Sequence, residues 1–335
     1  MPESPPPSSL AVVVDVQDTQ QAIDALEAEG VYDPSRSVEP HAEGVAVPVT
    51  ARPETVGGRV TEVDLPARNR DLRDLLAARG WSDDALDQVP SSWAVLGTCI
   101  VVDDADFPEK EAVGDALLDL HGNADTVLLH RGVSGRQREP DVEVLAGVGD
   151  TEVVHTEHGT KYAMDLSAVM FSPGNQAERA RMGEVVDDGE HVFDMFAGIG
   201  YFTLPMARSG AAVTAAEINP EAYRYLVENS VLNRVEGRVS AFRADCRDVD
   251  ATADRVVMGY YEAHEYLDAA LDALVPGGTL HLHETTPDPE LWARPVGRIE
   301  AATDARGRAV EVLDRRVVKS HAPGVKHVVV DARVD

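Results

Sequence analysis

Two glycines, Gly198 and Gly200, stand in the stretch DMFAGIGYFTLPMA (194–207), between a short apolar run and an amphipathic one. Glycines at such a place allow either a close approach of the backbone to a nucleotide-type cofactor or only a tight turn between a strand and a helix. An acid at the end of the second strand of a Rossmann-like unit accepts hydrogen bonds from a ribose diol. Glu217 ends the run AAVTAAE, 17 residues beyond Gly200, and we therefore expect a nucleoside-containing cofactor.

The spacing of the glycines favours one class of cofactor. A dinucleotide site prefers the longer pattern G-x-G-x-x-G, which leaves room for a pyrophosphate, whereas the third position here is Thr203. Further along the chain comes ADCRD (244–248), where the carboxylate of Asp245 can receive the adenine amino group. Cys246 suits a packing role better than a nucleophilic one, because no histidine pairs with it in the sequence. These features predict S-adenosylmethionine rather than a nicotinamide dinucleotide.

The elements around these residues alternate regularly. Strands are expected at 192–193, 213–217, 239–243, 255–258 and 279–284, and helices at 203–209, 220–233 and 264–274. Such βαβαβ alternation predicts a parallel, doubly wound sheet. The expected fold class is therefore α/β, with a Rossmann-like catalytic domain over residues 169–335.

Two smaller parts precede this domain. Residues 1–65 are expected to form a small α/β module, with strands at 10–16 and 44–49 and a helix at 19–29. Residues 66–168 are expected to form a middle domain. Its predicted helices are 71–79 and 110–121, and its predicted strands are 93–102, 126–130, 142–146 and 162–166. The chain is thus a Rossmann-like domain preceded by small α/β or α+β domains.

The charge of the chain bears on its partners and its surroundings. There are 59 acidic and 30 basic residues, giving a net charge of −29, while 44% of the residues are apolar. The acids are spread through segments rich in Val, Ala and Leu, which is typical of a globular protein that is soluble at very high salt. We therefore expect a halophilic protein. In molar salt the Debye length is only about 3 Å, so the net charge does not argue against RNA as a partner.

Cysteine usage and hydropathy bear on the compartment, and histidine spacing bears on metals. The two cysteines, Cys99 and Cys246, provide neither a disulfide framework nor a Cys-rich zinc site. No run approaches the roughly 18 apolar residues of a membrane span, so a cytoplasmic protein is predicted. His281 and His283 alternate on an expected strand and share one face, but no third ligand stands at a suitable spacing. We expect no metal.

Four segments together resemble a known family. They are DMFAGIGYFTLPMA (194–207), AEINPEAYRYLVENSVLN (216–233), ADCRDV (244–249) and DRVVMGYYEAHEYL (254–267). The combination is similar to class I S-adenosylmethionine enzymes that act on the tRNA purine beside the anticodon, and residues 121–181 resemble the preceding domain of that family. The resemblance covers about residues 65–335. It implies a class I methyltransferase fold, tRNA as partner, and a middle domain of the RNA-binding type.

Two branches of this family differ in their chemistry. One methylates guanosine N1 and carries an Asn-Leu-Pro or Asn-Pro-Pro type segment where this chain has MGY (258–260). MGY, HEYL (264–267) and HLHET (281–285) resemble the other branch, the archaeal-type wybutosine-synthesis aminocarboxypropyltransferases. The resemblance therefore implies transfer of the 3-amino-3-carboxypropyl group of S-adenosylmethionine to C7 of 4-demethylwyosine at position 37 of tRNA(Phe). Methylation of guanosine-37 at N1, and binding of cofactor and RNA without turnover, are the alternatives.

Geometry can select between the two reactions. A sulfonium has three electrophilic carbons, and the carbon held in line with a nucleophile about 3 to 3.5 Å away reacts. Attack by C7 on the methionine Cγ releases methylthioadenosine and leaves the amino and carboxylate groups on the RNA. Such an enzyme must keep the aminocarboxypropyl arm near its substrate instead of burying the arm in a tight charge clamp.

The resemblance also implies the residues of the cofactor site. In FSPGNQAERAR (171–181), Ser172 and Arg179 are expected to contact the cofactor. Without the resemblance, Arg179 could simply lie on a solvated charged face. The family often has a basic residue where this chain has Gly174. The other expected cofactor-binding residues are Asp194, Phe196, Gly198, Gly200, Glu217 for the ribose, and Asp245 with Cys246 for the adenine.

Substrate contacts and the catalytic base carry weaker signals. Arg136 and Arg138 stand in a glycine-containing loop, and arginine can hold phosphate oxygens through paired hydrogen bonds. Gly259 and Tyr260 follow the fourth strand, where the two branches differ, and are also expected to bind substrate. His264 or an acid is the candidate base for the C7 proton. The sequence leaves the oligomeric state open, and a monomer is compatible with it.

Overall fold

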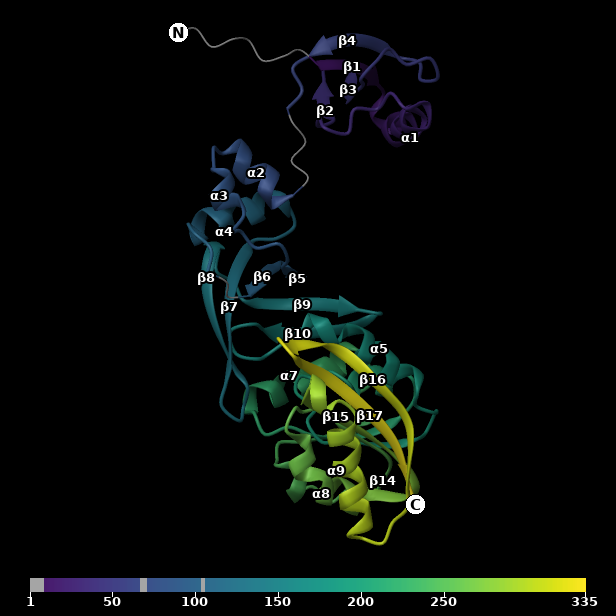
Figure 1. The fold of residues 1–335 in the computed structure, drawn as a ribbon. Helices are drawn as coiled ribbons and strands as arrows, with labels where there is room; N and C mark the ends of the chain where they lie inside the picture. Colours follow the sequence, from purple (N-terminus) through teal and green to yellow (C-terminus); the bar gives the residue numbers. More distant parts are fainter. Residues whose placement is uncertain (1–8, 67–70, 104–105) are drawn as a thin grey trace. The chain divides into compact units, whose positions relative to one another are not determined.

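A computed structural model of the protein describes residues 9–66, 71–103 and 106–335 (Figure 1). The chain forms two compact units. One unit comprises the chain up to Val89 together with Phe107–His121, and the other comprises Pro90–Asp106 together with Gly122–Asp335. The domain boundaries predicted near residues 65 and 168 stay predictions.

The first unit contains a small antiparallel sheet. β1 (Ser9–Val14) lies between β3 (Gly44–Pro48) and β4 (Arg59–Val63), and β2 (Glu39–His41) pairs with the other edge of β3. α1 (Thr19–Glu29) buries Leu26 against the valines of β1 and β3 and ends at Gly30, whose φ of +78° is the left-handed conformation that favours glycine. Three more helices belong to this unit: α2 (Leu72–Ala78), α3 (Asp83–Leu86) and α4 (Lys110–Leu120).

A four-stranded sheet begins the second unit. β5 (Ala94–Leu96) and β6 (Cys99–Asp103) are antiparallel, β7 (Thr126–Ser134) lies parallel to β6, and β8 (Glu139–Gly147) is antiparallel to β7. The prediction of one strand over 93–102 is wrong, because Gly97, with a φ of +58°, and Thr98 form a two-residue turn there. A hairpin of β9 (Glu152–Glu157) and β10 (Thr160–Asp165) follows.

Seven strands form the central sheet of the second unit, in the order β13-β12-β11-β14-β15-β17-β16. They are β11 (His191–Asp194), β12 (Ala212–Ala216), β13 (Val239–Phe242), β14 (Ala253–Met258), β15 (Leu274–Pro287), β16 (Val310–Ala322) and β17 (Val325–Val334). The parallel arrangement is confirmed from β13 to β15. The sheet continues with two strands that the prediction did not include, and β17 is antiparallel to both β15 and β16.

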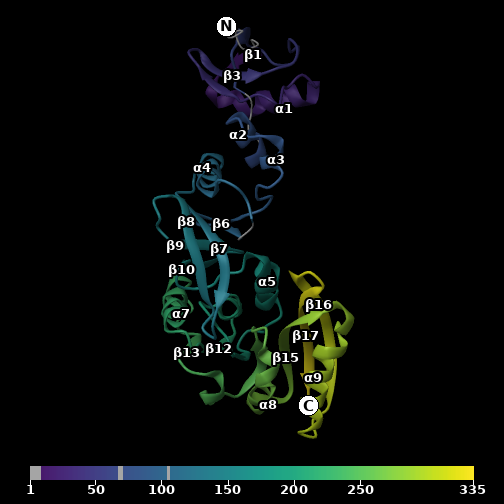
Figure 2. The same ribbon diagram turned by 60° about the vertical axis from the view of Figure 1, so that its left-hand side comes forward.

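Helices cover both faces of this sheet. Val192 of β11 packs into a core with α5 (Gln176–Glu184), α6 (Thr203–Arg208) and α7 (Pro220–Leu232). The next residue, Phe193, packs into a second core with α8 (Leu267–Ala273) and α9 (Ala293–Asp304). Successive strand residues point to opposite faces, and Figure 2 shows α9 over β15 and β17. The α/β fold class with a doubly wound sheet is therefore confirmed.

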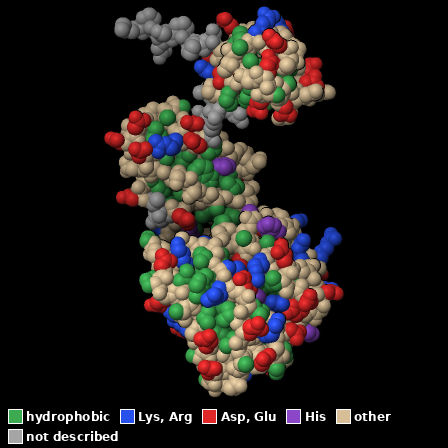
Figure 3. Space-filling view, turned by 45° about the vertical axis from the view of Figure 1, so that its right-hand side comes forward, with side chains coloured by type: hydrophobic (Ala, Val, Ile, Leu, Met, Phe, Trp, Pro, Cys, Tyr) green, Lys and Arg blue, Asp and Glu red, His purple; other side chains and the backbone are tan. Residues whose placement is uncertain are grey.

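Two further expectations concern the spread of acidic residues over the surface and membrane-spanning segments. On the face shown in Figure 3, Asp and Glu side chains are spread over the surface and do not form one acidic block. Among the described residues, no helix combines the length and the apolar character that a membrane crossing requires.

Candidate cofactor and substrate site

One cavity of about 810 Å³ lies where four parallel strands of the central sheet end. Its wall includes Phe196 after β11, Glu217 after β12, Asp245 after β13 and Gly259 after β14. Ligands of open α/β sheets bind in the crevice outside the carboxyl ends of the strands. The volume lies within the range of small-molecule sites, about 300 to 1,000 Å³.

Most of the predicted site residues line this cavity. They are Ser172, Arg179, Phe196, Gly198, Glu217, Asp245 and Cys246 from the expected cofactor site, and Arg136, Arg138, Gly259 and Tyr260 from the expected substrate site. Asp194, Gly200 and His264 lie outside the lining. Direct contact of any of these residues with a ligand stays a prediction.

The glycine turn needs both of its glycines. Gly198 has a φ of +57° and Gly200 a φ of +103°, which side chains other than glycine rarely adopt. A Cβ atom on Gly198 would lie 2.2 Å from Cε2 of Tyr201, and one on Gly200 would lie 2.7 Å from Cγ of Leu204. Gly200 therefore serves the turn alone, whereas Gly198 serves the turn and also borders the cavity.

Asp194 supports this turn from below. Its fully buried carboxylate accepts hydrogen bonds from Oγ1 of Thr203 at 2.7 Å and from the backbone N–H of Phe196 at 3.4 Å. Burial raises the pKa of Asp194 to about 6, although these hydrogen bonds oppose the shift. Asp194 therefore links the end of β11 to the start of α6 and holds the glycine turn in place. It does not line the cavity itself.

Glu217 connects the glycine turn to the start of α7. Its carboxylate accepts the backbone N–H groups of Gly198 and Asn219, each at 2.7 Å. Asn219 caps α7, because its side-chain oxygen accepts the N–H of Glu221 at 2.9 Å. Burial raises the pKa of Glu217, while the backbone hydrogen bonds lower it. A carboxylate has about four lone-pair positions, so Glu217 keeps acceptor capacity for a ligand hydroxyl.

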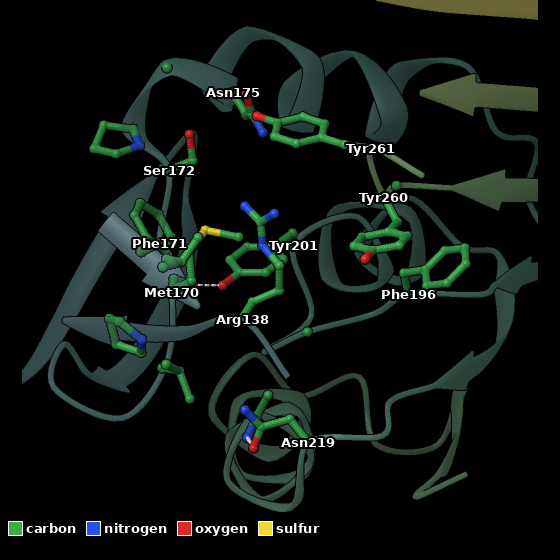
Figure 4. A pocket seen from close by; sticks show the side chains of 18 of the residues that line it. Arg138, Met170, Phe171, Ser172, Asn175, Phe196, Tyr201, Asn219, Tyr260 and Tyr261 are labelled. Atoms are coloured by element: carbon green, nitrogen blue, oxygen red, sulfur yellow. Dashed lines mark hydrogen bonds between the residues drawn. The ribbon is translucent and has the colours of Figure 1, made fainter. Parts of the chain in front are cut away.

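Aromatic rings gather at another side of the cavity. The ring of Phe196 lies 5.2 Å from that of Tyr260 (Figure 4). It also lies 5.1 Å from the ring of Tyr266. Cys246 is buried, and burial with the nearby charge of Asp245 raises the pKa of its thiol to about 12. A thiol with this pKa is a poor nucleophile at neutral pH, which agrees with the packing role expected for Cys246. Tyr266, which also lines the cavity, was not singled out by sequence reasoning.

Arg179 is buried, so the alternative of a solvated charged face is wrong. It pairs with Glu157 and donates from Nη1 to the carbonyl oxygen of Ser172 at 3.0 Å. The hydroxyl of Ser172 accepts a hydrogen bond from Nζ of Lys319 at 2.6 Å. The stem of Lys319 occupies the space beside Gly174, where a Cβ would lie 3.0 Å from Cδ of the lysine. A cation from β16 thus stands next to the position where the family often has a basic residue.

Two neighbouring histidines line the cavity, unlike His264: His283, which the sequence analysis considered as a metal ligand, and His327, which it did not consider. His283 and His327 are each 1% exposed, and Nδ1 of His283 lies 3.1 Å from Nε2 of His327. They come from the antiparallel neighbours β15 and β17. No local motif in the sequence indicates that these two strands are neighbours. The contact between His283 and His327 therefore could not be predicted from the sequence.

His281 is held in a polar network instead of facing a metal. Its Nε2 lies 2.7 Å from Nη1 of Arg255 and its Nδ1 lies 2.6 Å from Oδ1 of Asp331. The guanidinium can only donate, so Nε2 accepts and Nδ1–H donates to the carboxylate. Within the described part of the chain, no group of three or more His, Cys, Asp or Glu side chains is arranged to hold a metal ion.

Comparison with known proteins points to one family. Residues 153–313 match the family model described as the TRM5/TYW2 methyltransferase domain, and residues 72–151 match the TYW2 N-terminal domain. The chain is 38% identical over 269 residues to the tRNA(Phe) (4-demethylwyosine(37)-C(7)) aminocarboxypropyltransferase of Pyrococcus horikoshii, a match that covers 78% of this chain and 96% of that protein.

Two further relatives are informative. The tRNA (guanine(37)-N(1))-methyltransferase Trm5b of Pyrococcus abyssi is 32% identical over 253 residues, covering 73% of this chain and 76% of that protein. The crystal structure of P. horikoshii TYW2 in complex with MeSAdo superposes with a TM-score of 0.68 at 36% identity, covering 78% of this chain and 97% of that one.

Proposed function

Because this chain belongs to the TRM5/TYW2 family, we propose that it transfers the 3-amino-3-carboxypropyl group of S-adenosylmethionine to C7 of 4-demethylwyosine in tRNA(Phe). The observation that carries the proposal is the cavity at the ends of β11 to β14, whose wall combines Gly198, Glu217 and Asp245. The aminocarboxypropyltransferase of P. horikoshii supports this choice of reaction, since its identity to the chain is higher than that of Trm5b.

The residues of the cavity fit a nucleoside with a sulfonium. Glu217 keeps free acceptor positions for the ribose hydroxyls, and Asp245 is an acceptor for the adenine amino group. The rings of Phe196, Tyr260 and Tyr266 offer faces on which the adenine can pack. Bound S-adenosylmethionine supplies the electrophilic carbon. The protein's part is then to hold the purine of the tRNA in line with that carbon.

The residue after β14 supports aminocarboxypropyl transfer over methylation. A Cβ on Gly259 would lie 2.7 Å from Cε2 of Phe202, which is itself buried in the cavity wall. A segment of the Asn-Pro type at 258–260 would therefore require Phe202 to move. Phe202 occupies the space that a side chain at position 259 would need.

Mass spectrometry of the products tests the proposal. Purified protein and S-adenosylmethionine are incubated at high KCl with tRNA(Phe) that carries 4-demethylwyosine, and in parallel with tRNA that carries guanosine-37. We expect the demethylwyosine to gain the mass of one aminocarboxypropyl group in place of hydrogen, with methylthioadenosine released. A methyl group gained by guanosine, with S-adenosylhomocysteine released, would instead identify an N1-methyltransferase. Bound cofactor without either product would identify a binding protein.

We also propose that the protein works in the cytoplasm at molar salt. The support is compositional: a net charge of −29 with only two cysteines. Screening of like charges stabilises such a fold. We expect the thermal unfolding midpoint to rise steadily as KCl increases from 0.1 M to several molar, whereas a midpoint that is independent of KCl would contradict the halophilic assignment. Sedimentation in the same buffers would establish whether the protein is a monomer.

A further inference from the structure

The carboxylate of Asp245 is already fully occupied by hydrogen-bond donors. Its Oδ1 accepts the backbone N–H of Arg247 at 3.1 Å and Nε of Arg247 at 2.9 Å. Its Oδ2 accepts Nη2 of Arg247 at 2.7 Å and also Nη2 of Arg136. These are four N–H donors, the thiol of Cys246 lies a further 3.9 Å from Oδ1, and a carboxylate offers about four lone-pair positions. An adenine amino group can therefore bind Asp245 only if one of these donors leaves.

Arg136 is the donor that is held more weakly. Arg247 makes three hydrogen bonds to Asp245, and its guanidinium lies 4.8 Å from the centre of the Tyr266 ring. Arg136 makes one hydrogen bond to Asp245 and a long one of 3.4 Å to the hydroxyl of Tyr266. The two arginines are similarly exposed, 55% for the side chain of Arg136 and 53% for that of Arg247, so they differ in the number of their hydrogen bonds and not in their exposure. An exposed arginine that makes a single hydrogen bond to the carboxylate can leave for solvent at little cost.

Arg136 belongs to a hairpin tip that borders the cavity. The tip is the turn between β7 and β8, and its carbonyl at Gln137 accepts a hydrogen bond from Nδ2 of Asn219 at 3.1 Å. On its other side Arg138 reaches into the cavity, with its guanidinium 5.2 Å from the centre of the Tyr261 ring (Figure 4). The two arginines of the tip thus line the cavity that the substrate base must enter.

We propose that Arg136 is a latch: it occupies the adenine position on Asp245 until the cofactor displaces it, and the released guanidinium then binds a phosphate of the tRNA. This inference rests on the proposed function, since it requires an adenine at Asp245 and an RNA substrate. Arginine holds phosphate oxygens through paired hydrogen bonds. In the latched state the charge of Arg136 is compensated by its ion pair with Asp245. When the cofactor displaces Arg136, the guanidinium becomes available to pair with a phosphate of the RNA.

The latch predicts that the cofactor and the tRNA bind with positive cooperativity. Cofactor binding frees a cation for the tRNA, so tRNA must bind more tightly when the adenine position is filled. By thermodynamic linkage, tRNA must strengthen cofactor binding by the same factor. Removal of Arg136 has two opposite effects: it removes a competitor of the adenine, and it removes a phosphate contact.

The experiment compares the parent protein with R136Q, R136A and the control R131Q. Arg131 lies in the same hairpin, pairs with Glu143 and does not line the cavity, so R131Q makes the same charge change elsewhere. Methylthioadenosine is the probe, because it carries the adenine but no transferable aminocarboxypropyl group. Its affinity is measured by titration calorimetry at high KCl, and the affinity for tRNA(Phe) is measured by fluorescence anisotropy with and without methylthioadenosine.

We expect both Arg136 variants to bind methylthioadenosine about two- to fivefold more tightly than the parent protein and R131Q, the range given by an exposed ion pair. Methylthioadenosine should strengthen tRNA binding by the parent protein and by R131Q, but not by the Arg136 variants. Equal or weaker methylthioadenosine binding by both Arg136 variants, with normal binding by the parent protein, would overturn the latch alone. A parent protein that binds no methylthioadenosine or S-adenosylmethionine would overturn the proposed function and the latch with it.

Discussion

Glu157 and Arg179 form a buried ion pair with two parallel hydrogen bonds. Nε of Arg179 lies 2.6 Å from Oε2 of Glu157, Nη2 lies 2.8 Å from Oε1, and both side chains are 3% exposed. The guanidinium also lies 4.6 Å from the centre of the Phe171 ring and donates to the carbonyl of Ser172. The pair therefore fixes the segment before α5, where that segment borders the cavity.

Removal of the carboxylate from this pair should strongly destabilise the protein. E157A leaves a guanidinium buried without its counter-ion, which costs about 3 to 5 kcal/mol in the free energy of unfolding. Denaturation by guanidinium chloride measures this loss. The double variant E157A/R179M removes both charges and should recover part of it, because an apolar pair avoids the unpaired charge. A loss below about 1 kcal/mol for E157A, typical of a surface pair, would contradict this account.

Glu217 should contribute to cofactor affinity through its charge. Hydrogen bonds to charged groups contribute about 1.5 to 3 kcal/mol, so we expect E217A to weaken binding of S-adenosylmethionine by roughly 10- to 100-fold. Titration calorimetry measures the change. The matched control is E221A, because Glu221 lies four residues further on, is exposed and pairs with Arg224. If E217A and E221A bind the cofactor equally well, Glu217 does not hold the ribose.

Gly198 should tolerate no side chain. In G198A the new Cβ meets the ring of Tyr201, which is held in place because its hydroxyl donates to the carbonyl of Met170. The left-handed backbone alone costs about 1 to 2 kcal/mol, and the clash adds to this cost. Gly189 offers a matched control, since its φ is +80° and, among the described residues, nothing lies within 4 Å of its added Cβ. G198A should therefore lower the unfolding midpoint more than G189A and should also weaken cofactor binding, and equal effects of the two variants would show that no clash occurs.

The sequence predicted the parts of the fold that local patterns specify. The strand, the glycine turn, the following helix and Glu217 all lie within one βαβ unit of about 25 residues, and their mutual position follows from the geometry of that unit. Most of the residues predicted for a cofactor site therefore line one cavity. Asp194 and Gly200 belong to the same motif, yet they support the turn and do not line the cavity. A motif identifies a turn, but it does not tell which side chains of the turn point at the ligand.

The parts that escaped prediction depend on distant pairing. β17 inserts between β15 and β16, and this order cannot be inferred from a pattern of alternating strands and helices. Lys319 and His327 reach the cavity only through that insertion. The contact of Arg136 with Asp245 joins residues 109 positions apart. Sequence reasoning placed the two residues in different roles and had no means of bringing them together.

The pair of His283 and His327 should make stability depend on pH. Burial lowers the pKa of His283 to about 3, with the charge of Arg316 adding to the effect, and burial with the neighbouring His283 lowers the pKa of His327. In the unfolded chain a histidine has a pKa of about 6.5. Below that pH the unfolded state binds more protons than the folded state, so stability is present above pH 6.5 and falls as the pH drops below it.

At pH 5.5 each of these two histidines should lower the free energy of unfolding by about 1.4 kcal/mol relative to its value well above pH 6.5. The reason is that pH 5.5 lies one unit below the pKa of histidine in the unfolded chain. Denaturation by guanidinium chloride at pH 7.5 and 5.5 measures the difference. H283Q/H327Q should remove about 3 kcal/mol of this pH dependence, while H158Q, which replaces an exposed histidine, should retain it. His281 is also buried with a lowered pKa and acts in all three proteins. A double variant with the full pH dependence of the parent would mean that the buried pair accepts protons without unfolding.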